Sequence, residues 1–296
     1  MAHVTVFCFL ASYLVAFVLE LSRLLGRSRI SRVIMVGFGL GGFVAHTWYL
    51  MNRHAETQLP PLLASAHDWV LVLAWVLALF YLFLTLIQAF SRQDLAVGVF
   101  VLPVVLILVL STYVLSQEPN TESAAALSRR GWGMLHASAL VFGMTSGAAG
   151  LVSGIMYLLQ HHRLKARHAP PTGLRMPNLV RLAQINRWSM IVTYFFLTLG
   201  FASGVYLALP AAGGQSTVGF SDPVVIGSGL VWLLFGGMFG LLMTHRSPSG
   251  RQVAWMTIAG SGFLLVTLLG LQVVTGSMHG AASAASAHAR ATEGRR

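Results

Sequence analysis

The chain has 296 residues, of which 56% are hydrophobic and only 9% are Asp, Glu, Lys or Arg. A soluble domain carries about 25% charged residues, so this composition excludes a water-soluble globule, and its hydrophobicity excludes an intrinsically disordered chain. The single cysteine, Cys8, excludes a disulfide-rich extracellular scaffold. The composition therefore predicts a polytopic membrane protein, and the net charge of +11 must be interpreted in that context.

A helix that crosses a bilayer needs about 20 largely apolar residues. Eight segments meet this requirement, in chain order Val4–Leu25, Val33–Met51, Trp69–Phe90, Leu95–Leu115, Trp132–Leu159, Trp188–Leu209, Val224–Met243 and Val253–Thr275. They predict an all-α bundle of about eight transmembrane helices. We expect one transmembrane domain over residues 1–277, followed by an external, disordered tail over residues 278–296 that is rich in Ala and Ser.

The loops alternate in charge. Most Lys and Arg residues fall within 23–32, at 92, within 163–187 and within 246–251, which are the loops after the odd-numbered spans. Because basic loops remain on the inner side, both termini are predicted to lie outside, in the periplasm or its equivalent. The excess of positive charge therefore indicates orientation in the lipid bilayer, and we expect no nucleic-acid partner.

Glycines recur at four-residue spacing inside the spans, a pattern that lets helix backbones approach closely. The pairs are Gly37 and Gly41, Gly143 and Gly147, Gly150 and Gly154, Gly200 and Gly204, and Gly236 and Gly240. Packing within one bundle is favoured over a dimer interface as the reason for them.

Histidine is the polar residue that stands out in the spans. His136 lies about one turn inside the fifth span, and His279 lies just past the end of the eighth, so both are predicted to reach the outer face. His46 lies in the outer half of the second span, and His54 follows in the next loop. A histidine within the membrane is a functional-site candidate, because burying it without a partner is costly.

Two imidazoles on opposite faces of a porphyrin ligate haem iron, so haem is one hypothesis for this histidine pair. Arg129 and Arg130 precede His136 by about two helical turns, and their planar guanidinium groups match the carboxylates of the haem propionates. The outer tryptophans Trp48, Trp69 and Trp132 are candidates for flat apolar walls. The alternatives are an interfacial aromatic belt for the tryptophans and a hydrogen-bonded helix end for each histidine.

Three stretches carry a resemblance to a known family. The first joins Arg53-His54 to Leu59–Leu62 and to a span ending in Ala74–Leu82, and the second is Gly133–Ser138 around His136. The third joins Ser221-Asp222-Pro223 and Trp232 to Leu268–Leu271 and Met278-His279-Gly280. In this order and spacing, the chain resembles the cytochrome c assembly family of haem-handling membrane proteins (CcsA, CcmC and the HemX-like proteins).

The resemblance implies that His136 and His279 ligate a non-covalent, b-type haem on the outer face and present it to apocytochrome c. It also implies that other histidines hold haem before presentation, with His46 and His245 as the candidates and His54 as a competitor. A ResB/CcsB-type membrane partner and a bacterial inner (cytoplasmic) membrane follow from the same resemblance.

The loop between the sixth and seventh spans departs from the family pattern. The family has a tryptophan-rich loop there, whereas this short loop contains no tryptophan and keeps only Asp222-Pro223 of the usual Trp-Asp-Pro. This resembles the HemX-like branch. We therefore expect a non-enzymatic assembly factor, or a subunit of a haem ligase complex, in c-type cytochrome biogenesis. The alternatives are a HemX-like regulator of haem synthesis and a permease-like transporter.

Overall fold

The computed structural model describes residues 4–25, 29–90, 97–115, 117, 130–165, 176–209, 223–244, 249–267 and 270. The described part of the chain is helical and contains no strand. Its elements are, in chain order, α1 (Val6–Leu25), α2 (Arg29–Thr57), α3 (Pro61–Ala64), α4 (Ala66–Phe90), α5 (Gly98–Ser111), the 3-10 turn η1 (Thr112–Val114), α7 (Arg130–Lys165), α8 (Leu179–Ala208), α9 (Pro223–Thr244) and a helix over 250–267.

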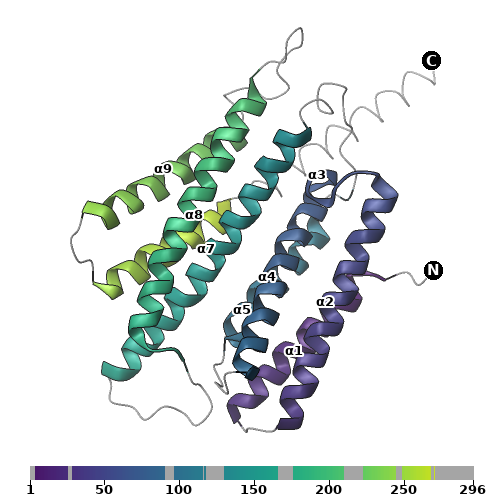
Figure 1. The fold of residues 1–296 in the computed structure, drawn as a ribbon, viewed down its shortest axis with the longest axis vertical. Helices are drawn as coiled ribbons and strands as arrows, with labels where there is room; N and C mark the ends of the chain where they lie inside the picture. The colour runs from purple at the N-terminus through teal and green to yellow at the C-terminus, as the bar shows by residue number, and fades with distance from the viewer. Residues whose placement is uncertain are drawn as a thin grey trace, which may run out of the picture.

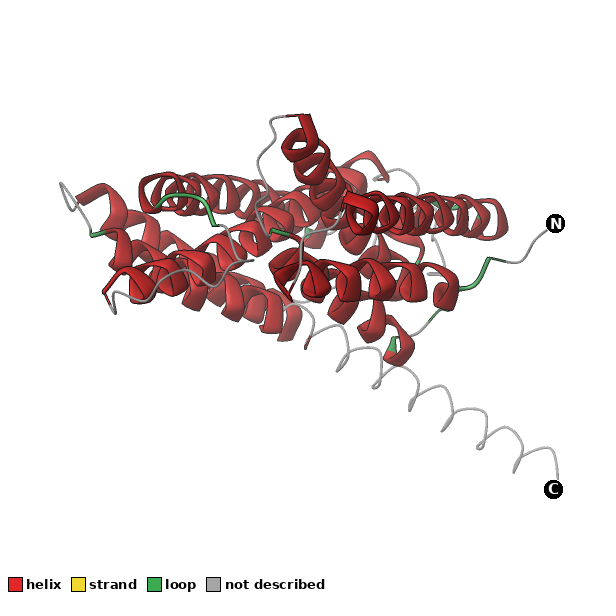
Figure 2. Ribbon diagram, turned by 90° about the horizontal axis from the view of Figure 1, so that it is seen from below, coloured by secondary structure: helices red, strands yellow, loops and turns green. Residues whose placement is uncertain are grey.

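The helices form two groups that lie side by side (Figures 1 and 2). The N-terminal group contains α1, α2, α4 and α5, and the C-terminal group contains α7, α8, α9 and the helix 250–267. The groups meet where α3, α4 and α5 contact α7. In Figure 1, α9 and the helix 250–267 are steeply inclined to the α7–α8 pair.

Among the labelled helices α1 to α9 of the described part, α7 and α8 make the most extensive contact. Small residues allow the two backbones to approach: the Ser146 and Ser189 hydroxyls each donate to the other residue's carbonyl. A Cβ added at Gly150 would lie 2.7 Å from Thr257 Cγ2, so the helix 250–267 packs into the same seam. Close packing inside the bundle is confirmed for most of the paired glycines, whereas Gly37, Gly41 and Gly240 have nothing within 4 Å of an added Cβ.

The predicted all-α membrane bundle is confirmed. Each of the eight predicted spans overlaps a described helix, and α2, α7 and α8 extend beyond the apolar segments by a turn or more at one or both ends. Five described helices are long and apolar enough to cross a membrane, and α7 is the most buried of them. The short helix α3 was not predicted. It begins at Pro61, where the ring fixes a helical φ and no amide proton is needed.

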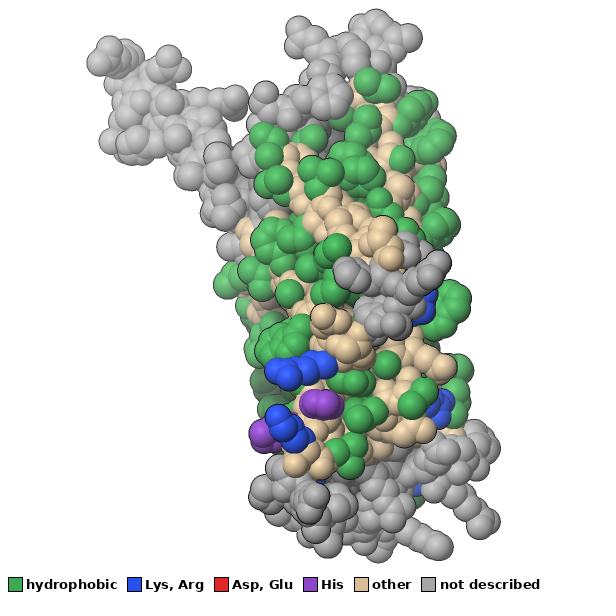
Figure 3. All heavy atoms as spheres, turned by 90° about the vertical axis from the view of Figure 1, so that its left-hand side faces the viewer, with side chains coloured by type: hydrophobic (Ala, Val, Ile, Leu, Met, Phe, Trp, Pro, Cys, Tyr) green, Lys and Arg blue, Asp and Glu red, His purple; other side chains and the backbone are tan. Residues whose placement is uncertain are grey.

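The basic side chains of the described residues are unevenly distributed over the face shown in Figure 3. Hydrophobic side chains cover its upper part, and the Lys, Arg and His side chains lie in the lower half. Exposed basic residues occupy the helix ends there: Lys165 ends α7, Arg181 begins α8, and Arg251 begins the last helix. These are the ends that the alternating loop charge predicts to face inward. The predicted tail, 278–296, lies outside the described residues.

Candidate functional site

His136 is held between α7 and α8. Its Nδ1 lies 2.8 Å from the carbonyl oxygen of Gly200, and the Ser203 hydroxyl lies 3.4 Å from the same nitrogen. A carbonyl only accepts, so Nδ1 carries a proton and donates it; in the neutral imidazole, the free lone pair is therefore on Nε2. An imidazole fixed in this way through Nδ1 is the usual form of a metal-ligating histidine.

Two aromatic rings lie one turn beyond His136, toward the predicted outer face. Trp132 on α7 and Tyr206 on α8 have ring centroids 4.6 Å apart, and both side chains are partly exposed. Arg130 begins α7 two residues before Trp132 and is half-buried. A basic group, a partly exposed aromatic pair and an imidazole therefore follow one another along the start of α7.

His46 lies in the other helix group and is completely buried. Its ring stacks on Phe9 of α1 at a centroid distance of 4.2 Å, and its Nδ1 lies 3.4 Å from the Tyr13 hydroxyl. Its Nε2 has no hydrogen-bond partner in the described part of the chain, although the Leu71 backbone lies near the imidazole. An unpartnered imidazole nitrogen in a membrane core marks a ligand position or a strained site.

The remaining described candidates lie elsewhere. His54 is exposed, and its Nδ1 lies 2.8 Å from the Leu59 carbonyl, so it closes the turn after α2. Trp232 on α9 donates its indole proton to Thr198 Oγ1 at 3.0 Å and stacks on Phe201. Among the described residues, no hydrogen bond or ring contact joins His46, His54 or Trp232 to His136.

A buried ion cluster where the end of α2 meets the start of α4 was missed in the sequence. Asp68 is fully buried and accepts from Arg53 Nε at 3.0 Å and Arg53 Nη2 at 2.9 Å. Ser65 donates to the same carboxylate, and His67 Nδ1 lies 3.2 Å from it. The fork of Arg53 is therefore occupied. The Ser65-x-x-Asp68 spacing at a helix start was the available signal.

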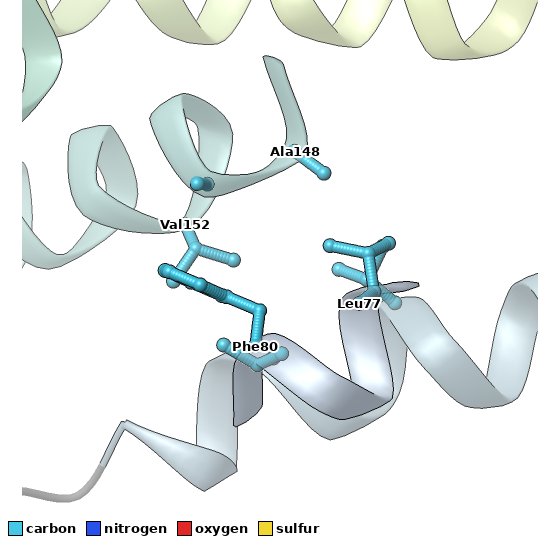
Figure 4. Close-up of a pocket in the computed structure, with 7 residues that line it drawn as sticks. Leu77, Phe80, Ala148 and Val152 are labelled. Carbon is cyan, nitrogen blue, oxygen red and sulfur yellow. The ribbon is translucent and has the colours of Figure 1, made fainter. Parts of the chain in front are cut away.

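A small hollow lies between the two helix groups (Figure 4). It is too small to hold a water molecule, and its lining is entirely apolar, with Leu77 and Phe80 from α4 facing Ala148 and Val152 of α7. Small-molecule sites have volumes of about 300–1,000 Å³ and include a few polar groups. This hollow is a packing defect at the seam.

Four of the candidates predicted from the sequence are not described by the structure. Arg129, Asp222, His245 and His279 lie outside the described residues. Within the described part, no three His, Cys, Asp or Glu side chains gather as a metal-binding group. Trp69, a candidate wall, is buried in the core of the N-terminal group, whereas Trp48 and Trp132 are exposed.

Comparison with protein families places most of the chain in a known family. The family described as Cytochrome C assembly protein matches residues 63–279, which is well over half of the chain. The matched segment begins in α3 and contains both His136 and His279. No curated protein matches the chain.

Proposed function

The chain belongs to the cytochrome C assembly protein family, and from this premise we propose that it binds haem non-covalently and presents it on the outer face through His136 and His279. At the coarser level, it is a multi-pass membrane protein of c-type cytochrome biogenesis. Its family associates it with haem and apocytochrome c. What we propose beyond the family is which residues ligate haem, that the haem is non-covalent and b-type, and that it is presented on the outer face.

The observation that carries the proposal is the hydrogen bond from His136 Nδ1 to the Gly200 carbonyl. It leaves Nε2 as the nitrogen available to iron and holds the ring on the α7–α8 pair. His279, the second proposed ligand, follows the last span in the sequence, on the same predicted side of the membrane as His136. Two neutral imidazoles would hold the iron of a haem through their free nitrogens.

The side chains around His136 also fit a flat, apolar ligand with an anionic edge. The exposed faces of Trp132 and Tyr206 offer aromatic contact surface beside the imidazole. Arg130, and Arg129 next to it in the sequence, offer positive charge for the propionates. Arg53 is excluded from that role in this arrangement, because Asp68 occupies its fork.

We assign His46 to an earlier, holding position inside the bundle, with His245 as its proposed companion. The unpartnered Nε2 of His46 supports this assignment, because a buried imidazole nitrogen without a partner costs stability that ligand binding recovers. His54 is the weaker competitor, since its Nδ1 closes a loop and its ring lies at the surface.

The chain's own residues hold and orient the ligand. His136 would offer Nε2 to the iron, and the Trp132–Tyr206 pair, one turn away along α7, would offer aromatic surface to the ring. When bound, haem supplies the groups that form thioether bonds with the cysteines of the acceptor. Those cysteines must be reduced, and the one cysteine here, Cys8, does not provide a dithiol. A separate thiol reductant and a ResB/CcsB-type partner are therefore part of the proposal.

Purified full-length protein in detergent tests this function. We expect added haemin to give a six-coordinate, low-spin spectrum that the His136→Ala/His279→Ala variant loses and the His54→Ala control retains. A wild-type protein that takes up no haem contradicts the proposal. If haem binds but cytochromes c mature without the gene, the result favours a HemX-like regulator that acts through its exposed inner residues, such as Lys165 and Arg181.

A further inference from the structure

The imidazole of His136 occupies a recess in α8 that exists because residue 204 is glycine. A Cβ added at Gly204 would lie 2.9 Å from His136 Cε1 and 3.2 Å from its Nδ1. Both distances are shorter than normal carbon contacts. The ring is rigid and is held by its hydrogen bond, so an alanine at position 204 forces the imidazole off α8.

Two neighbours on the same face of α8 complete the recess. Gly200, one turn earlier, provides the carbonyl that accepts from Nδ1, and a Cβ on it would lie 2.9 Å from Leu140 Cδ2 of α7. The Ser203 hydroxyl lies 2.9 Å from that same carbonyl oxygen and 2.8 Å from the Leu199 carbonyl oxygen, so its one proton is divided between these two acceptors. Gly200, Ser203 and Gly204 together are called the His136 seat below.

We propose that the His136 seat contains the positioning residues that decide which nitrogen of His136 meets the ligand. The inference rests on the proposed function, because it specifies how that same site is set. Gly204 lets the ring lie against α8, the Gly200 carbonyl fixes the proton on Nδ1, and Nε2 is left as the ligating atom. Ser203 shares the carbonyl and so lowers its strength as an acceptor for Nδ1.

Helix packing alone makes a different prediction, and the chain offers a matched control for it. A Cβ added at Gly154 of α7 would lie 2.8 Å from Ile258 Cγ1, a clash of the same severity with an aliphatic side chain. Gly237 of α9 has nothing within 4 Å of an added Cβ. Gly154→Ala thus measures the effect of a steric clash between helices that does not involve His136. Gly237→Ala measures the effect of a Gly-to-Ala change in a helix where no clash arises.

The first test needs no haem. In protein labelled with nitrogen-15 at histidine, the wild-type His136 signal, assigned by its loss in His136→Asn, is expected to show a protonated Nδ1 and an unprotonated Nε2. Gly204→Ala is expected to shift this signal, and Gly154→Ala is expected to leave it unchanged. An identical signal in Gly204→Ala overturns the inference, whether or not the protein binds haem.

The second test uses haemin. We expect Gly204→Ala to weaken binding by about tenfold or more and to lose the low-spin signature. Gly154→Ala should lower the melting temperature yet retain that signature, and Gly237→Ala should match wild type. If the Gly204→Ala protein binds haem as tightly as wild type and with an unchanged spectrum, the proposed role of the His136 seat is refuted. Absence of haem binding by wild type refutes the proposed function instead.

A third variant keeps the inference testable if Gly204→Ala does not fold. Ser203→Ala removes a hydroxyl without adding volume and frees the Gly200 carbonyl to accept more strongly from Nδ1. A stronger bond there increases the electron density on Nε2 and favours oxidised iron. The reduction potential of the bound haem should therefore shift to more negative values, and an unchanged or raised potential contradicts the assigned role of Ser203.

Discussion

Removal of Arg53 is expected to destabilise the bundle far more than removal of an ordinary surface arginine. Asp68 is fully buried, and Arg53 contributes two of the donors that reach its carboxylate, at 3.0 and 2.9 Å. Arg53→Ala leaves a buried carboxylate without its counter-charge, a change that costs about 3–5 kcal/mol in folding free energy. Ser65 and His67 still contact the carboxylate, so we expect a value near 3 kcal/mol.

A double substitution distinguishes the loss of the ion pair from the cost of leaving one buried charge without its partner. Replacing both partners with apolar residues, as in Arg53→Met/Asp68→Leu, removes the buried charge along with its counter-charge. Such replacements are often neutral or stabilising. We therefore expect the double variant to unfold within about 1 kcal/mol of wild type, which gives a large coupling energy in the double-mutant cycle.

Unfolding with SDS in mixed micelles, followed by circular dichroism, measures these free energies. Arg181→Ala is the control, because Arg181 is exposed at the start of α8. An exposed ion pair contributes roughly 0–1 kcal/mol. If Arg53→Ala costs no more than Arg181→Ala, Asp68 is hydrated in the folded protein and the reasoning from its burial is refuted.

Three further predictions follow from the packing and the charge pattern. Trp232→Phe keeps the ring that stacks on Phe201 but loses the bond to Thr198, so the same unfolding assay should show a loss of about 1 kcal/mol, and Thr198→Val should add little to it; full additivity would argue against that bond. Gly150→Leu should separate α7 from α8 and lower the melting temperature by several degrees, whereas an unchanged value would mean that the seam is loosely packed. A reporter fused after Gly173 should register as cytoplasmic, and a periplasmic signal would reverse the assignment of faces.

The helices were predictable because hydrocarbon thickness imposes a simple requirement on the sequence. Each apolar segment of about 20 residues marks a helix, since a backbone in lipid must satisfy its own hydrogen bonds. The helix ends were less predictable. The first residues of α8, from Leu179, include the exposed Arg181 and Arg187, so the helix continues beyond the apolar segment that begins at Trp188. Hydropathy does not detect such a polar extension.

The candidate site was predictable at the level of single residues but not of contacts. His136 stands out because histidine is rare within a membrane span, yet its partner is a backbone carbonyl, which every residue carries. The need for glycine at position 204 was hidden in a spacing that also describes ordinary helix packing. Asp68 was overlooked because it precedes the apolar segment by one residue, although folding buries it against Arg53.

The central claim is that this bundle serves c-type cytochrome biogenesis through His136. The most direct measurement is the amount of covalent haem on c-type cytochromes, read by haem staining of membrane proteins after denaturing electrophoresis. In cells that lack the gene, we predict that the stained cytochromes disappear, that the wild-type gene restores them, and that the His136→Ala gene does not. Normal staining in the deletion strain, or full restoration by His136→Ala, would contradict the account.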